Sequence, residues 1–124
     1  MSPPNAPSPE ELRQLPQQRA EEIHTNKNLD AIDDFFAPDW VGHTNGEDLT
    51  RAEYKAFERQ FNTGFPDAEL TYAPVIVEGD TLAAHWVMTG THSGEVLGVE
   101  PTGRTVTVTG TFIVRYDEDG RAVE

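Results

Sequence analysis

The chain has 124 residues, enough for one domain with a single core, and a domain of this size buries roughly 60–70% of the surface that its unfolded chain exposes. It contains no cysteine, which excludes disulfides, thiol catalysis and cysteine-ligated metal centres. Nine Lys and Arg against 22 Asp and Glu give a formal net charge of −13, which excludes nucleic acid and anionic lipid as partners because both are themselves negatively charged.

Membrane partners are not expected either. No window approaches the roughly 18 consecutive apolar residues of a membrane span, and the N-terminus lacks the basic segment followed by an apolar one that directs export. We therefore expect a cytoplasmic protein. The acidic residues are spread over predicted helices, loops and strand ends, which is typical of a surface adapted to concentrated salt, and we hypothesise a halophilic cytosol.

The N-terminal part is predicted to be helical after a short leader. Residues 1–8 are rich in proline and serine and lack an apolar period, so we expect them to be disordered, with a single domain over 9–124. A helix starts at Ser8 in a capping-box pattern. Pro16 is expected to interrupt this helix, which then resumes and runs to about Thr25.

Two further helices are predicted. Apolar residues recur at spacings of three and four over 29–36, which indicates a short helix that ends before a proline. A brief extended segment over 39–43 and an Asn-Gly turn lead to the strongest helix, over 50–64, which opens with a second capping box. One face of this helix carries Tyr54, Phe57 and Phe61.

The rest of the chain is predicted to form long antiparallel strands. The first runs over 68–77 and contains Pro74, which makes it an edge strand or a bulged one. After a Glu-Gly-Asp turn the second runs over 81–91, with His85 on the face opposite to its apolar residues. Those apolar residues are Leu82, Ala84, Trp86 and Met88.

A third strand is predicted at the end of the stretch from Gly90 to Arg115, whose first part is punctuated by glycines. Apolar and threonine side chains alternate here, so one face of the strand is apolar. The apolar positions are Val106, Val108, Phe112 and Val114, and the threonines are Thr105, Thr107, Thr109 and Thr111. Helices followed by antiparallel strands predict an α+β domain, in which the N-terminal helices cover the concave side of a curved sheet and leave a pocket between the layers.

The last residues are predicted to begin another strand. Asp119-Gly120 is a strong hairpin turn, so residues 121–124 should pair back on the strand over 105–116, yet they cover less than half of it. The rest of that strand is expected to be an exposed edge, as in a domain that lacks most of its last strand. Three explanations stay open: a shortened gene product, another subunit over the edge, or a natural continuation beyond these residues.

Several short motifs, each weak alone, follow one another between Asn28 and Glu124. They are Leu29 to Phe36 with Pro38-Asp39-Trp40-Val41 and His43, then Phe65-Pro66-Asp67, Glu78-Gly79-Asp80, Gly90 to Glu95, Leu97-Gly98, Pro101 to Arg104, Arg115 and Asp119-Gly120-Arg121. In this order and at this spacing they resemble the SnoaL-like polyketide cyclase family of the nuclear-transport-factor-2-like superfamily.

The resemblance implies a cone-shaped α+β barrel around an apolar cavity, and a homodimer formed through the outer face of the sheet. It also implies ring closure by intramolecular aldol condensation, in which a carboxylate removes a proton next to a carbonyl with neither metal nor cofactor. The acid/base aspartate of the cyclases would follow Glu124, on a strand that this sequence does not contain. Val114 stands where these cyclases carry a pocket histidine.

His43 and His85 are the catalytic candidates. His43 follows Trp40 at the predicted mouth of the pocket and could act as acid, base or hydrogen-bond donor, with a structural role as the alternative. His85 could instead pack in a dimer interface, and His92 in its Gly-Thr-His-Ser-Gly turn is more simply structural. Because no two of these histidines share a metal-ligand spacing, no metal site is expected.

The aromatic side chains are expected to fill the core or to line the cavity, where a small apolar ligand such as a flat polycyclic compound would suit them. The predicted pocket-lining set is Trp40, Tyr54, Phe57, Phe61, Phe65, Trp86, Phe112 and Val114. Two functions are weighed: an enzyme that binds an apolar carbonyl compound, and a non-catalytic dimeric ligand-binding module of the same fold. Hydration or isomerisation would need a buried carboxylate, and the residues named for the pocket include none.

Overall fold

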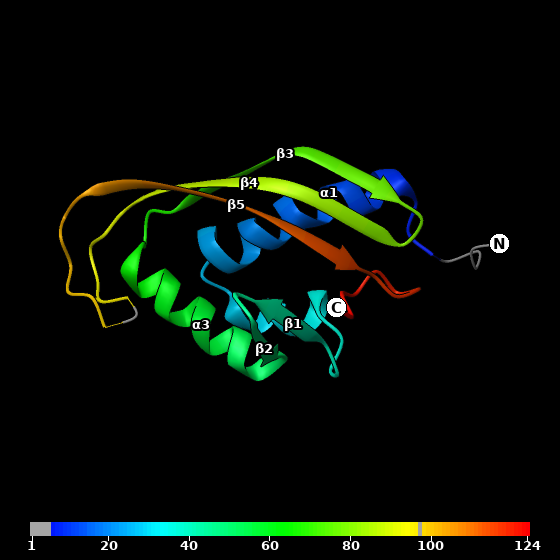
Figure 1. The fold of residues 1–124 in the computed structure, drawn as a ribbon, viewed down its shortest axis with the longest axis horizontal. Helices are drawn as coiled ribbons and strands as arrows, with labels where there is room; N and C mark the ends of the chain where they lie inside the picture. The colour runs from blue at the N-terminus through cyan, green and yellow to red at the C-terminus, as the bar shows by residue number, and fades with distance from the viewer. Residues whose placement is uncertain (1–5, 97) are drawn as a thin grey trace.

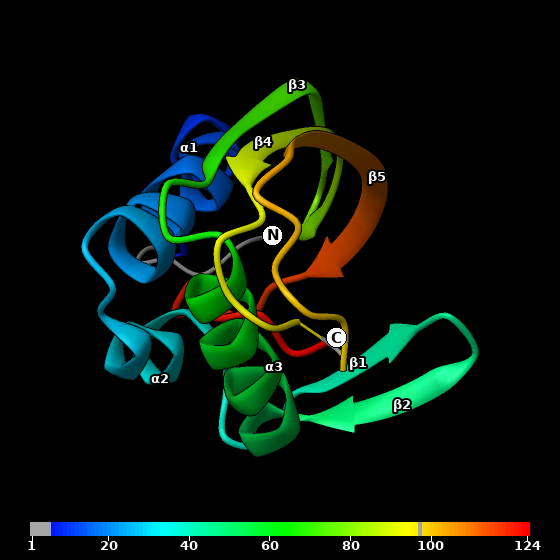
Figure 2. The same ribbon diagram turned by 90° about the vertical axis from the view of Figure 1, so that its left-hand side faces the viewer.

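The computed structural model describes residues 6–96 and 98–124. A curved three-stranded sheet forms one layer, and helices cover its concave side (Figures 1 and 2), so the predicted α+β architecture is confirmed. The helical elements are α1 (Pro9–Ala20), the π-helical turn η1 (Glu21–Thr25), the 3₁₀ turn η2 (Leu29–Ala31), α2 (Ile32–Phe35) and α3 (Arg51–Gly64). The strands are β1 (Val41–Thr44), β2 (Glu47–Thr50), β3 (Glu69–Glu78), β4 (Thr81–Thr91) and β5 (Thr105–Arg115).

Helix α1 begins where the sequence predicts but is not interrupted by Pro16. The hydroxyl of Ser8 accepts a hydrogen bond from the backbone N–H of Glu11, and the Glu11 carboxylate accepts one from the N–H of Ser8, each at 3.1 Å. Such a cap stabilises a helix by about 1 kcal/mol. The predicted break at Pro16 is wrong because this side chain is buried in the core, where its packing offsets the one backbone hydrogen bond that proline cannot make. Residues 1–5 of the predicted leader lie outside the described residues.

Strands β1 and β2 form a separate hairpin that leads into α3 (Figure 1). The predicted turn joins them at Asn45 and Gly46, which have positive φ angles of 52° and 83°. The hydroxyl of Thr50 accepts a hydrogen bond from the N–H of Glu53 at 3.2 Å, and the Glu53 carboxylate accepts one from Thr50 at 3.0 Å. The second predicted capping box is therefore confirmed, and it fixes the start of α3.

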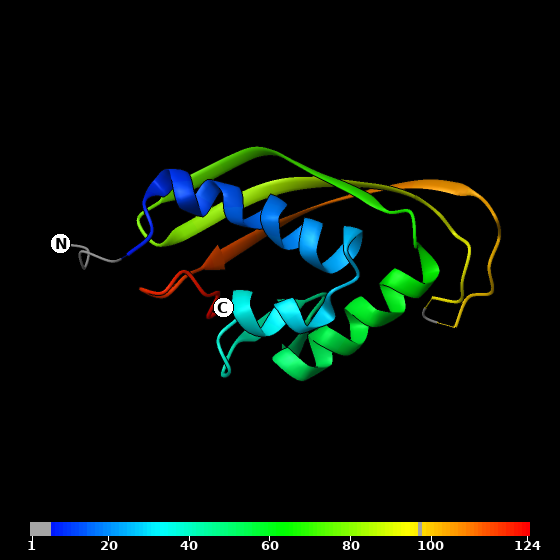
Figure 3. The same cartoon turned by 180° about the vertical axis from the view of Figure 1, so that it is seen from behind.

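The three long strands form an antiparallel meander in the order β3-β4-β5. The pairing of β3 with β4 shifts between Tyr72 and Val75, around Pro74, so the predicted bulge in this strand is confirmed. Helix α1 lies alongside β3, as the view from behind shows (Figure 3). Among the described residues, no helix is long and apolar enough to cross a membrane.

The two faces of β4 and β5 are those that the alternation predicts. Phe112 pairs with Ala84 and Val114 pairs with Leu82, and directly paired residues of antiparallel strands point to the same face. These four side chains join the hydrophobic core on the concave side. The threonines of β5 lie on the convex side, where His85 pairs with one of them.

The residues after β5 return to it and close one end of the core. The N–H of Val123 donates to the Arg115 carbonyl at 2.8 Å, and the N–H of Arg115 donates to the Glu124 carbonyl at 3.0 Å. Ala122, which is 1% exposed, donates to the carbonyl of Phe35 at 2.8 Å. The predicted pairing of residues 121–124 with this strand is therefore confirmed, and within the described part of the chain the rest of the outer edge of β5 has no partner strand.

Candidate functional site

Polar side chains gather in the interior between the helices and the concave face of the sheet. They come from α1, η1, α3, β3 and the residue that follows β5. We call them the inner cluster, which consists of Arg19, His24, Tyr54, Glu58, Asn62, Tyr72 and Tyr116. None of these side chains is exposed. The interior is therefore not purely apolar.

Arg19 places a positive charge in this interior. Its guanidinium carbon lies 5.2 Å from the ring centroid of Phe112 and 5.6 Å from that of Phe36. Burial lowers the pKa of Arg19, but the oxygens of the surrounding tyrosines raise it by more, so the net shift is upward. Among the described residues, no carboxylate forms an ion pair with it. Aromatic faces and hydroxyl groups hold this cation, rather than an acid.

The tyrosine hydroxyls beside Arg19 keep their protons. Burial raises the pKa of Tyr54, the negative charge of Glu58 raises it further, and Arg19 opposes both effects only in part. Burial also raises the pKa of Tyr116. Both hydroxyls therefore keep their protons at neutral pH, and that of Tyr54 is hydrogen-bonded to Glu58.

A buried carboxylate and a buried histidine meet in the inner cluster. Glu58 is 6% exposed and His24 is 8% exposed, and Nε2 of His24 lies 2.9 Å from Oε2 of Glu58. On the other side of the imidazole, Nδ1 lies 2.8 Å from Oδ1 of Asn62. The amide nitrogen of Asn62 donates to the Ile23 carbonyl at 2.8 Å, which turns its oxygen toward the imidazole.

The Asn62 contact determines which nitrogen of the imidazole carries a proton. Because Oδ1 of Asn62 only accepts, Nδ1 of His24 carries a proton. Nε2 then faces a carboxylate oxygen of Glu58 at 2.9 Å. The contact is poorly aligned as a hydrogen bond, and Oε2 has no hydrogen-bond partner in the described part of the chain. Glu58 therefore has a free lone pair as well as a neighbour that can exchange a proton with it.

The π-helical turn positions His24. The N–H of Asn26 donates to the carbonyl of Glu21 at 2.8 Å, five residues back instead of the four of an α-helix. In this wider turn two consecutive side chains, Ile23 and His24, are both buried. Single π turns are frequent at functional sites because they redirect a side chain in this way.

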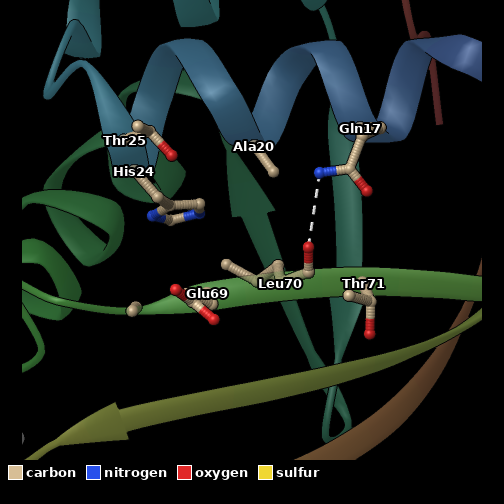
Figure 4. A pocket seen from close by; sticks show the side chains of 8 residues that line it. Gln17, Ala20, His24, Thr25, Glu69, Leu70 and Thr71 are labelled. Carbon is tan, nitrogen blue, oxygen red and sulfur yellow. Dashed lines mark hydrogen bonds between the residues drawn. The ribbon is translucent and has the colours of Figure 1, made fainter.

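His24 also lines a groove that opens to solvent. The groove has a volume of about 260 Å³ and lies between α1 with η1 on one side and the edge strand β3 on the other (Figure 4). Gln17 spans it, donating through Nε2 to the Leu70 carbonyl at 3.3 Å. Further lining residues are Ala20, Thr25, Ala68, Glu69 and Thr71. The imidazole therefore connects this groove with Glu58.

The structure places the two predicted catalytic histidines on different sheets and outside the inner cluster. His43 is exposed on β1, where Nδ1 lies 2.7 Å from Oδ1 of Asp48 and Nε2 lies 2.9 Å from Oε2 of Glu124. The hydrogen bond with Asp48, followed by that with Glu124, raises the pKa of His43. His85 lies on the convex side of the sheet.

His92, predicted to be structural, is buried at the end of β4. Its ring stacks on Phe65, with 5.5 Å between the centroids, and its Nδ1 lies 3.2 Å from the hydroxyl of Thr102. Nε2 has no hydrogen-bond partner among the described residues.

The predicted pocket-lining residues have different surroundings. Val114 is buried in the core, Trp86 is partly buried over Gly110, and Phe57 is 41% exposed. The others pack against neighbouring aromatic rings of the interior, with centroid separations from 5.0 to 6.0 Å. These are Trp40, Tyr54, Phe61, Phe65 and Phe112.

Sequence reasoning missed Arg19, His24 and Glu58. Arg19 of α1 falls four residues before the buried Ile23 of η1, and Glu58 falls four residues after Tyr54 on α3, so helical spacing could have placed both side chains inward. No comparable signal exists for His24, because α-helical spacing does not anticipate a π turn. The interior thus holds a buried carboxylate that the sequence-based list of pocket residues lacks.

The fold and the chain as a whole match known proteins. A family model for SnoaL-like polyketide cyclases matches residues 14–124. The chain belongs to this family. The resemblance noted from the sequence motifs is confirmed. Within this SnoaL-like domain, no three His, Cys, Asp or Glu side chains of the described residues are grouped so as to hold a metal ion.

Solved structures of other proteins share the fold. AclR from Streptomyces galilaeus, a candidate hydroxylase, is 27% identical with a TM-score of 0.82, and the match covers 94% of this chain and 86% of that one. IdmH from Streptomyces antibioticus, a candidate polyketide cyclase, is 29% identical with a TM-score of 0.70, over 89% of this chain and 87% of that one. A candidate SnoaL-like polyketide cyclase from Jannaschia sp. CCS1, at 23% identity, a TM-score of 0.73 and coverage of 94% and 85%, supports the fold alone. No curated protein matches the chain.

Proposed function

We propose that this SnoaL-like domain binds an apolar carbonyl compound in its interior and removes a proton next to the carbonyl, as a cofactor-independent cyclase does. The observation that carries the proposal is Glu58, a buried carboxylate with a free oxygen beside a histidine that can share its proton. A carboxylate of this kind is a suitable general base. Membership of the family supports the same reaction class.

In the proposed reaction, Oε2 of Glu58 takes the proton from the carbon next to the ligand's carbonyl, and the electrons of that C–H bond move onto the carbonyl oxygen. The charge of Arg19 stabilises the resulting enolate. The enolate carbon then attacks a second carbonyl of the same ligand, which forms the C–C bond that closes the ring. The new alkoxide recovers the proton from Glu58, so no cofactor is consumed.

Hydrogen–deuterium exchange tests the proton-transfer step without knowledge of the natural substrate. 2-Tetralone in D₂O should exchange the protons next to its carbonyl faster with the protein than in buffer, because the ketone is apolar and enolisable. Glu58→Gln should remove most of this enhancement, since a general base contributes about 10²–10⁴-fold. The matched control is Glu118→Gln, an exposed carboxylate in the turn after β5, which should exchange like the wild type. Equal rates in wild type and Glu58→Gln would contradict the proposal.

A non-catalytic ligand-binding module of the same fold is the second proposal. It is favoured by the engagement of both imidazole nitrogens of His24, one by Asn62 and one by Glu58. Binding of 2-tetralone without any acceleration of exchange is the outcome that this alternative predicts. Measuring both the binding of 2-tetralone and its exchange rate therefore separates the two functions.

We further propose that the domain forms a homodimer through the convex face of the sheet. A row of apolar side chains crosses this face, because Ile76 pairs with Ala83 and Ala83 pairs with Ile113. Ile76 is 60% exposed and Ile113 is 74% exposed, and burial of such a row favours association. Analytical ultracentrifugation should find a dimer that Ile113→Glu converts to a monomer, and a monomeric wild type would contradict this proposal.

We propose that the protein is located in a cytoplasm with a high salt concentration. With a net charge of −13 the carboxylates of the surface repel one another, and molar salt shortens the range of that repulsion to about 3 Å. Tm should therefore rise from dilute buffer to molar potassium chloride. An unchanged Tm would contradict the halophilic hypothesis.

A further inference from the structure

The positive charge of Arg19 has no acidic partner among the described residues, although acidic residues outnumber basic ones in this chain by 22 to nine. Other cations pair with carboxylates: Arg13 with Glu10 at 2.7 Å, and Lys55 with Asp30 at 3.1 Å. Arg19 instead lies over two phenylalanine rings. A cation removed from water is costly unless an anion is supplied, and a ligand can supply it.

Glu58 does not pair with this charge. Its Oε2 lies 2.9 Å from Nε2 of His24, and no ion pair joins it to Arg19 among the described residues. The tyrosines beside Arg19 keep their protons, so they supply no negative charge either. A ligand with one negative charge would give the guanidinium the partner that it lacks.

The groups around Arg19 also match a particular kind of anion. A guanidinium presents N–H donors in a fork that fits the two oxygens of a carboxylate, and the hydroxyl of Tyr116 adds a donor. The ring of Phe36 packs 5.0 Å from Trp40 and 5.1 Å from Tyr54, so aromatic faces lie next to the cation. Such faces pack well against an aromatic ring of a ligand.

We infer that the interior of this domain takes an aromatic keto acid, whose carboxylate pairs with Arg19 while its carbonyl is presented to Glu58. The inference rests on the proposed function for the role of the carbonyl, and it adds the substrate class. Without the anionic group, a ligand would leave the guanidinium unpaired in the interior.

Calorimetric titration with two matched probes tests the inference. 4-Oxo-4-phenylbutanoate is an aromatic keto acid, and butyrophenone is the same ketone with a methyl group in place of the carboxylate. The wild type should bind the acid at least about tenfold more tightly, which corresponds to about 1.4 kcal/mol. Arg19→Met should abolish this preference, Arg19→Lys should retain part of it, and Arg13→Met, an exposed arginine on the same helix, should retain all of it.

Each outcome decides a different point. Circular dichroism confirms that the variants are folded, and Arg19→Lys keeps the charge if Arg19→Met does not fold. Binding of the ketone as tightly as the acid, or of neither probe, would overturn the inference about the anion. The keto acid could bind in a way that depends on Arg19 while 2-tetralone exchanges at the same rate with the wild type and with Glu58→Gln. That result would support the anion site and refute the proposed catalysis.

Discussion

Removing the carboxylate of Glu58 is expected to cost the domain a large part of its stability. In Glu58→Leu the imidazole of His24, which is 8% exposed, loses the group 2.9 Å from its Nε2. Breaking a buried pair by removing one partner costs about 3–5 kcal/mol. A small domain is stable by only about 5–15 kcal/mol in total, so Tm should fall by roughly 10–20 °C.

Two further variants separate the pair from its surroundings. Glu58→Gln should cost only about 1 kcal/mol, because the side-chain amide can donate to Nε2 of a neutral His24. His24→Leu combined with Glu58→Leu should cost less than the sum of the single variants, since two apolar groups then replace the pair. Urea unfolding, followed by the fluorescence of Trp40 and Trp86, measures the free energy of unfolding of each protein.

The control is Glu118→Leu, which removes an exposed carboxylate and should change the free energy of unfolding by less than about 0.5 kcal/mol. Two results would refute the reasoning. One is a loss in Glu58→Leu that is no larger than in the control. The other is a double variant whose loss equals the sum of the single losses to within about 0.5 kcal/mol, because uncoupled residues behave in that way.

Three other predictions follow from the contacts described. Asn62→Leu should lower the free energy of unfolding by about 2–4 kcal/mol, because it leaves both Nδ1 of His24 and the Ile23 carbonyl unpaired. The control is Asn26→Leu, at an exposed position, and a urea midpoint of Asn62→Leu no lower than that of the control would contradict the prediction. Gly110→Ala should cost about 1–3 kcal/mol in the same assay, because its Cβ would stand 2.6 Å from Cε2 of Trp86, whereas Thr111→Ala on the opposite face should cost less. The pKa of His43, raised above its usual value by Asp48 and Glu124, should fall in Asp48→Asn when followed by NMR, and an unchanged pKa would exclude the hydrogen bond as the cause. Because this pKa is higher in the folded state, the stability that His43 contributes is complete below about pH 6.5 and is lost as the pH rises through the folded value.

Local signals in the sequence predicted much of the fold. The helix caps at Ser8 and Thr50 depend on residues three positions apart, and the apolar face of β5 depends on a period of two, so both could be read without knowledge of tertiary contacts. Pro16 shows where such rules fail. Its local preference is to break a helix, but burial against distant segments decides the outcome.

The inner cluster could be predicted only in part. Charged residues are almost always exposed, so the apolar stripe of a helix does not predict that Arg19 and Glu58 are buried. What brings them inward is a set of partners far away in the chain: His24 and Asn62, for example, are 38 residues apart. A single sequence carries no direct signal for such a pairing.

The packing of α1 beside β3 also bears on the order in which the domain folds. Gln17 reaches the Leu70 carbonyl across 53 residues of chain, whereas β3 and β4 are joined by a tight turn. We expect the β3-β4 hairpin to form first and α1 to dock later, because closing a longer loop costs more entropy and long-range contacts form more slowly. Until docking, the guanidinium of Arg19 is fully hydrated, and that water must be removed as the helix closes over the sheet. Arg19 is therefore expected to slow the docking of α1 on the sheet.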